Sequence, residues 1–302
     1  MRLDTKETAR INCFNGGAGC AEGTMVLDGH IHLRATEGDR EEFRRRLKAA
    51  GVDGGIVISL PPPGSPLDRL TSVLKWCELS GNLYPFYWID PVAEDAMDQV
   101  GTAVEKGVSG FKVICGGFYP GDKRAMKTYA AIAKTGRPIL FHSGILWDGK
   151  PSSPYNRPAE FEALLEIEGL KFCLAHISWP WCDECIAVYG KFLNARTRKS
   201  DLSVEMFIDT TPGTPPIYRK ETLARLFTVG YDVENNVIFG TDSCANNYNI
   251  GWTQQWLDRD TAIFKELGLS QPALDGILAG NLRRFVGVSS AKIDKKLPRV
   301  GE

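Results

Sequence analysis

Residues able to bind a metal ion lie at the ends of apolar runs in this chain of 302 residues, which contains only four histidines. The candidates are His30 and His32 in DGHIHL, His142 in ILFHS, His176 in LAHIS and Asp242 in GTDS. Imidazole nitrogens and carboxylate oxygens are common ligands of Zn²⁺ and other borderline divalent ions. If these run ends meet in space, they can hold one divalent ion and leave a coordination position open for water.

The spacing of the first two histidines is that of a chelate. Side chains two positions apart on a strand point to the same face, so His30 and His32 project side by side, with Asp28 below them. Asp242 has the same parity as Gly240 and is expected to face the same interior. A single histidine after a strand is more often a hydrogen-bonded structural residue. The convergence of all the histidines favours a metal centre, with Zn²⁺ as the first choice and Mn²⁺ as the alternative.

The elements that position these residues are short apolar runs separated by amphipathic stretches of helical length. The runs cover residues 25–33, 54–60, 83–90, 110–115, 137–143, 170–178, 202–210 and 236–243. Helices are expected between most of them, for example over 41–51 and 126–136. Eight such units predict a distorted (β/α)8 TIM barrel. An open doubly wound sheet is the second choice, because no G-x-G-x-x-G follows the first run.

We expect one domain over residues 1–302, with an N-terminal extension at 1–24 and a C-terminal tail at 288–302. Three patches rich in proline and glycine, PPPGSP, GKPSSPYNRP and TTPGTPP, follow predicted strands and are interpreted as long loops. Such loops build the functional face of a barrel. They supply candidate substrate-binding residues: Arg34, Tyr119, Trp147, Arg157 and Trp179, with Tyr155 and Trp181 nearby.

Composition narrows the class of protein. Charged residues make up 24% and hydrophobic residues 43%, and the formal net charge is -1, so there is no summed positive field to attract nucleic acid. The sequence shows neither a membrane span nor a signal peptide. We therefore expect a cytoplasmic protein that acts on a small molecule and binds neither nucleic acid nor membrane. Assembly into a homo-oligomer stays open.

The eight cysteines are interpreted as free thiols, since several lie inside apolar runs. An all-thiolate zinc site formed by Cys13, Cys20, Cys182 and Cys185 is the weaker alternative. Six residues separate the first pair, which is outside the usual spacing of two to four.

Taken together, these motifs resemble the amidohydrolase superfamily, and within it the amidohydrolase-related group of metal-dependent hydrolases, lactonases and non-oxidative decarboxylases such as aminocarboxymuconate semialdehyde decarboxylase. DGHIHL is similar to its first-strand H-x-H, GRPILFHSG and LAHIS to its fifth- and sixth-strand histidines, and VIFGTDS to its eighth-strand aspartate. LSQPALDGILAGNLRRFVG resembles its C-terminal helix. The resemblance spans about residues 24–287.

The resemblance implies a ligand set of His30, His32, His142 and Asp242, with His176 beside the open position. Lys112 lies where binuclear members carry a carboxylated lysine that bridges two metals. We expect one metal and an unmodified Lys112; a second metal, or a charged Lys112 that binds a substrate carboxylate or phosphate, is the alternative.

The implied reaction is hydrolysis of a lactone, ester or amide by a metal-activated water. Asp242 would carry the proton and His176 would polarise the carbonyl of a substrate that is carboxylate-bearing or aromatic. Several decarboxylases of the group replace the first histidine of H-x-H by an acidic residue, whereas this chain has His30. Non-oxidative decarboxylation of an aromatic or enoic acid remains the second hypothesis, since the semialdehyde decarboxylase keeps H-x-H. A barrel that binds metal or ligand without turnover is the third.

Overall fold

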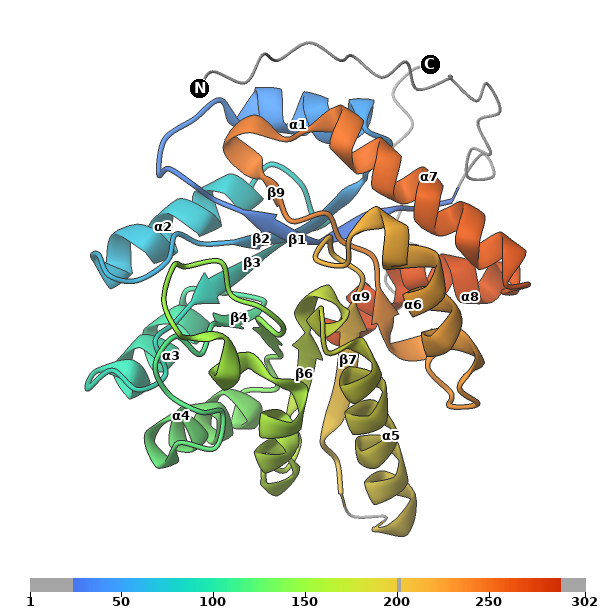
Figure 1. The fold of residues 1–302 in the computed structure, drawn as a ribbon. Coiled ribbons are helices and arrows are strands. Elements are labelled where there is room, and N and C mark those ends of the chain that lie inside the picture. Colours follow the sequence, from blue (N-terminus) through green and yellow to red (C-terminus); the bar gives the residue numbers. More distant parts are fainter. Residues whose placement is uncertain (1–23, 200–201, 289–302) are drawn as a thin grey trace, which may run out of the picture.

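A computed structural model describes residues 24–199 and 202–288 as a (β/α)8 barrel, with strands around a central axis and helices outside them (Figure 1). Each of the eight predicted runs contains a strand, and every paired strand is parallel to its neighbour. The strands are β1 Leu27–His32, β2 Gly54–Ile58, β3 Leu83–Trp88, β4 Gly110–Val113, β5 Ile139–Phe141, β6 Lys171–Leu174, β7 Glu205–Asp209, β8 Val237–Ile238 and β9 Ser243–Cys244.

The barrel is closed by its eighth run, which is split into β8 and β9. β8 pairs with β7, and β9 pairs with β1 on the other side. Between them, the backbone N–H of Gly29 donates to the carbonyl of Phe239 at 2.8 Å. Because one stretch of chain joins both ends of the sheet, the fold is a barrel, and the open doubly wound sheet is excluded.

Helices follow most of the strands. They are α1 Arg40–Ala49, α2 Pro66–Cys77, α3 Ala96–Glu105, α4 Lys123–Lys134, α5 Cys182–Arg198, α6 Pro216–Thr228, α7 Ile250–Glu266, α8 Gln271–Asp275 and α9 Asn281–Phe285. The two helices predicted from sequence are confirmed as α1 and α4, each begun by an aspartate whose side chain caps the first turn. After β5 the proline-rich loop forms 3₁₀ turns over Ser153–Asn156 and Pro158–Glu166.

Apolar side chains form two layers. The larger packs the helices against the outside of the barrel. The smaller fills the barrel interior, where α9 places Phe285 against Phe86 and Phe207. Arg284 of α9 also donates to Glu205 at the start of β7, and its carbonyl accepts from Lys171 at the start of β6. α9 therefore covers the N-terminal end of the barrel, and the carboxyl ends of the strands remain for function.

The extension predicted at 1–24 and the tail at 288–302 lie almost wholly outside the described residues, as do Cys13 and Cys20. The described cysteines are free thiols, as expected. Within the described ranges, no helix is long and apolar enough to cross a membrane.

Candidate active site

His30, His32 and Asp242 meet at the carboxyl end of the barrel. One ligand atom from each lies within 4.8 Å of the other two. The Nε2 atoms of His30 and His32 are 3.2 Å apart, and Oδ1 of Asp242 lies 3.2 Å from Nε2 of His32. The histidines are buried, whereas the Asp242 side chain is 36% exposed. The three donors therefore converge on a point that solvent can reach.

Close approach of β1 to the eighth run brings these residues together. A Cβ on Gly29 would lie 2.7 Å from Cγ2 of Ile238 and 2.9 Å from the oxygen of Phe239. Only glycine fits between the strands at this point. Strand parity predicts that Asp242 faces the interior, but its backbone lies in the gap between β8 and β9 and has a φ of 57°. That conformation, uncommon for a residue other than glycine, directs its carboxylate to the histidines.

Asp28 links the two sides of the seam, which is the contact between β1 and the eighth run. Its Oδ1 accepts from the backbone N–H of His30 at 3.0 Å and from that of Thr241 at 2.9 Å. Its Oδ2 accepts from the hydroxyl of Tyr248 at 2.8 Å. Burial raises the pKa of Asp28 to about 6, although these hydrogen bonds act in the opposite direction. Asp28 thus fixes the backbone on either side of the candidate ligands.

His176 follows β6 in a strained turn. Its φ is 65°, and the next two residues, Ile177 and Ser178, also have positive φ. A β-branched residue in this region is unfavourable and persists only where surrounding contacts hold it. Gly213 allows the approach of the β7 loop, since a Cβ there would meet Cβ of His176 at 2.7 Å. The ring centroid of His176 lies 5.3 Å from that of His30.

Asp209, a residue not predicted from the sequence, is buried at the end of β7 and contacts both His30 and His176. Its Oδ2 lies 2.9 Å from Nδ1 of His30, and its Oδ1 accepts from the backbone N–H of His176 at 2.7 Å. Although burial raises its pKa, the hydrogen bond from His30 and further donors hold the pKa well below its usual range. The available signal was its position: FIDT ends the seventh run as GTDS ends the eighth.

His142 lies after β5, next to His176, with ring centroids 5.0 Å apart. It does not join the three-residue cluster. Its Nε2 lies 3.2 Å from the carbonyl oxygen of Ile145, to which it can only donate. This leaves Nδ1 as the nitrogen with a free lone pair.

The charge states of the cluster suit a divalent cation. Burial lowers the pKa of His30, His32 and His142, and lowers that of His176 to about 4. These imidazoles are therefore neutral at pH 7, as ligands must be. Burial raises the pKa of Asp242, but the hydrogen bond from His32 and the electrostatic influence of the surrounding histidines together hold the pKa well below its usual range. Two neutral nitrogens and an ionised carboxylate, aimed at one point, form a donor set for Zn²⁺ or a related ion.

The family of the chain follows from a sequence match. The family model described as "Amidohydrolase" matches residues 72–288, more than half of the chain. The chain belongs to the amidohydrolase family. The match begins after β2, so the H-x-H of this amidohydrolase lies outside it and is placed by the fold alone. No protein with curated annotation matches the sequence significantly.

Solved structures agree on the fold at low identity. A probable 2-pyrone-4,6-dicarboxylic acid hydrolase from Acinetobacter baumannii, with citric acid bound, has a TM-score of 0.56 at 11% identity, over 87% of this chain and 99% of that one. A dihydroorotase from Campylobacter jejuni has a TM-score of 0.54 at 18% identity, over 86% of this chain and 82% of that one. An amidohydrolase from Burkhoderia ambifaria, with bound Zn, has a TM-score of 0.52 at 12% identity, over 83% of this chain and 69% of that one. At these identities the likeness shows the fold alone.

In this amidohydrolase, Lys112 is buried on β4, and its Nζ has no hydrogen-bond partner among the described residues. Burial lowers its pKa to about 8, although the charges of Asp209 and Asp242 act in the opposite direction. The amine is therefore mainly protonated at neutral pH, with a minor uncharged fraction, which is the form that reacts with electrophiles.

The loop residues proposed to bind substrate have different surroundings. Arg157 pairs with Glu184 at 2.9 Å and lies 5.6 Å from the Trp181 ring, so its guanidinium is already engaged. Trp179 stacks on Tyr218 with ring centroids 5.0 Å apart. Trp147 is 85% exposed.

Tyr119 and Arg34 complete the set of loop candidates. Tyr119 is 48% exposed and packs edge-on against Tyr155. Arg34 is exposed after β1, and its backbone N–H is held by Asn246. Of the candidate residues in the loops, Arg34 is the cation nearest to His32 along the chain.

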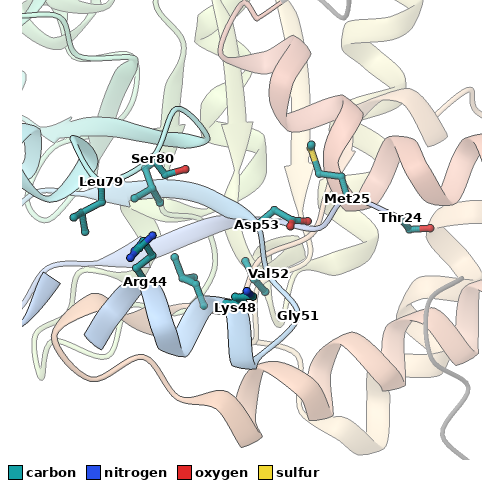
Figure 2. A pocket seen from close by; sticks show the side chains of 11 residues that line it. Thr24, Met25, Arg44, Lys48, Gly51, Val52, Asp53, Leu79 and Ser80 are labelled. Atoms are coloured by element: carbon teal, nitrogen blue, oxygen red, sulfur yellow. The ribbon is translucent and has the colours of Figure 1, made fainter. Parts of the chain in front are cut away.

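Two cavities differ in their relation to the cluster. One, of about 520 Å³, lies among the loops that follow β2, β3, β4 and β5, and Trp88 lines it. The Trp88 ring lies 5.7 Å from the His32 ring, so this cavity adjoins the cluster. The other, of about 600 Å³, lies where β2 begins and is lined by Arg44, Lys48 and Asp53 (Figure 2). None of the candidate site residues lines it, and it lies at the face that carries stability in barrels of this kind.

Proposed function

We propose that this amidohydrolase is a metal-dependent hydrolase that uses a metal-activated water on the carbonyl of a lactone, ester or amide. The observation that carries the proposal is the convergence of His30, His32 and Asp242 within 4.8 Å at the functional end of the barrel. Membership of the amidohydrolase family supports it, as does the bound Zn of one structural relative.

In the proposed site, His30, His32 and Asp242 hold the ion. His142 is proposed as the fourth ligand through Nδ1, because its Nε2 already donates to Ile145. When bound, a divalent ion lowers the pKa of water and polarises a carbonyl oxygen. Burial of the imidazoles keeps them neutral, so protons do not compete for their lone pairs.

Asp242 is the proposed proton carrier. Its carboxylate is ionised, partly exposed and anchored on one oxygen by His32 at 3.2 Å. It can take a proton from the attacking water and return it to the leaving group. Its unusual φ of 57° holds the side chain in reach of both ligand and solvent.

The cavity beside Trp88 is the proposed substrate pocket. Its volume of about 520 Å³ suits a small molecule. The indole of Trp88 offers an apolar face next to His32, and Lys150 at its lining offers a cation. We propose a planar or apolar substrate that also carries a carboxylate. The dicarboxylic acid named for one structural relative, which also holds citric acid, supports a carboxylate-bearing substrate.

The direct test is metal content. We expect about one divalent ion per purified chain, and loss of that ion when His30→Ala and His32→Ala are combined. A matched control is Arg157→Ala, which removes a charge near the mouth without touching the cluster. Metal that persists at wild-type level in the double variant contradicts the assignment.

Hydrolysis is separated from decarboxylation by the product. We expect a panel of lactones, esters and aromatic acids to yield carboxylate from the lactones and esters and no CO₂ from the acids. Release of CO₂ that depends on Asp242 would instead establish the lyase. A chelated sample serves as the blank for both assays.

We propose a single metal and an unmodified Lys112. The intact mass of the protein, measured under conditions that preserve carbamates, is expected to equal the sequence mass. A mass higher by one CO₂, together with two ions per chain, would establish the binuclear alternative.

A further inference from the structure

We infer that Asp209 and Thr211 are positioning residues that set the tautomers of His30 and His176, so that both rings present an Nε2 lone pair to the site. Five contacts define the arrangement. Oδ2 of Asp209 meets Nδ1 of His30 at 2.9 Å, and its Oδ1 accepts from the backbone N–H groups of His176 and Thr211 and from the Thr211 hydroxyl. The Thr211 hydroxyl also meets Nδ1 of His176 at 2.9 Å.

The direction of the first bond follows from the acceptor. Two backbone N–H groups, at 2.7 and 3.0 Å, and the Thr211 hydroxyl all donate to Oδ1 of Asp209, and a carboxyl group that accepts several such bonds is held in its ionised form. An ionised carboxylate has no proton to give, so Oδ2 also acts only as an acceptor. Nδ1 of His30 must therefore carry the proton. In a neutral imidazole the other nitrogen is then a lone-pair donor, and Nε2 of His30 is the atom that faces His32 at 3.2 Å.

The direction of the second bond follows from the first. A hydroxyl has one proton, and Thr211 gives it to Oδ1 of Asp209. Toward His176 the hydroxyl can then only accept, so Nδ1 of His176 is the N–H donor. Its Nε2 is left with a lone pair, on the side of the ring away from Thr211. One carboxylate thus orients two imidazoles, one directly and one through a hydroxyl.

An Nδ1–H tautomer gives His176 a different role from the one expected from the sequence. A neutral imidazole with its proton on Nδ1 cannot donate from Nε2 to a substrate carbonyl. His176 instead enters the reaction as a proton acceptor or as a further lone-pair donor; this consequence rests on the proposed function, whereas the tautomers themselves do not.

Two variants separate the two bonds. In Asp209→Asn, the amide oxygen must occupy the Oδ1 position, where three donors converge. The amide NH₂ then faces Nδ1 of His30 and donates to it, which moves the His30 proton to Nε2. His176 keeps its tautomer because Thr211 still has an oxygen to donate to. An asparagine that presents the wrong tautomer in this way is a known means of disabling an oriented imidazole.

The second variant, Thr211→Val, keeps the size of the buried side chain and removes the hydroxyl. His176 then loses its Nδ1 acceptor, while the bond between Asp209 and His30 is untouched. Thr211→Ser retains the hydroxyl and is expected to restore the wild-type tautomer of His176. The two variants therefore act on different histidines.

The experiment is long-range ¹H–¹⁵N correlation of the histidine side chains in the metal-free, full-length protein at neutral pH, with any histidine tag removed. The sequence has only four histidines, so each ring can be assigned by replacing it. We expect Nδ1–H tautomers for His30 and His176. We expect the Nε2–H tautomer for His142, set by Ile145. An Nε2–H tautomer for wild-type His30 or His176 overturns the inference without any variant.

In the variants, Asp209→Asn is expected to convert His30 alone and Thr211→Val to change His176 alone. Identical changes at both rings, or none, overturn the inference. Zn²⁺ affinity by chelator competition is the second readout: we expect Asp209→Asn to weaken it about 10–100-fold and Thr211→Val to leave it close to wild type. If the wild type binds no Zn²⁺, the proposed function fails, and the tautomer result still stands on its own.

Discussion

At the scale of single residues, Asp242 joins metal binding to proton transfer, because its carboxylate contacts His32 and is also partly open to solvent. We predict that Asp242→Asn keeps some metal but lowers turnover about 100- to 10,000-fold, since an amide cannot accept the proton. Steady-state rates and metal content measured on one preparation check this. Asp183→Asn, at an exposed ion pair with Arg225, is the control. Near-normal turnover in Asp242→Asn would remove it from the proton path.

At the scale of elements, the seam between β1 and the eighth run controls the cluster. We predict that Gly29→Ala destabilises the protein by about 1–3 kcal/mol, because its Cβ would overlap Ile238 and the Phe239 backbone. Urea unfolding measures the change. Gly101→Ala is the matched control: Gly101 is exposed in α3 with nothing within 4 Å of the added Cβ. It is expected to stabilise by about 0.5–1 kcal/mol. Equal effects of the two substitutions would show that the seam tolerates a side chain.

The contact between α6 and α7 supports the same end of the barrel. Nε of Arg219 donates to Asp260 at 2.9 Å with both side chains buried, and the guanidinium also donates to the carbonyl of Thr210, next to Asp209. Removing one partner leaves an unpaired buried charge, so we predict that Asp260→Ala costs about 3–5 kcal/mol of unfolding free energy.

Glu266→Ala is the control for this pair. It breaks an exposed pair with Lys220 between the same two helices and is expected to cost about 0–1 kcal/mol. The free energy of unfolding of both variants is measured by urea unfolding. Comparable losses would show that burial of the pair between Arg219 and Asp260 does not determine its contribution to stability.

At the scale of the whole molecule, Lys112 links stability to pH. Its pKa is about 8 in the fold and 10.5 ordinarily. Below pH 8 Lys112 is protonated in both the folded and the unfolded protein, and the buried charge lowers the free energy of unfolding by its full cost. Between pH 8 and 10.5 the unfolded state binds more protons, so this cost is relieved as pH rises.

We therefore predict that Lys112→Met, in metal-free protein of unmodified mass, is more stable than wild type by about 3 kcal/mol at pH 7. The difference should shrink toward zero as the pH approaches 10.5. Because the buried thiols and tyrosines titrate in both proteins, their contribution cancels in the difference between the unfolding free energies of Lys112→Met and wild type. Lys127→Met on the exposed side of α4 should show a flat profile. A constant difference for Lys112→Met would contradict the linkage.

The amino-acid sequence by itself determined the alternation of strands and helices, the barrel and the candidate ligands. Local rules suffice for these: apolar runs of strand length recur eight times, and side chains two apart share a face, which placed His30 beside His32. Asp242 was identified because it ends such a run. The family match and the fold confirm the class of protein that these motifs predicted.

Tertiary structure alone decided how the ends of different strands are joined. Contacts between distant segments determine the split of the eighth run and the φ of Asp242. They also determine the ion pair of Arg157 and the hydrogen bond between Asp209 and His30, which are 179 residues apart. A sequence pattern reports which face a side chain occupies, because that follows from the geometry of its own strand. It does not report which partner lies opposite, because that depends on the packing of the whole barrel.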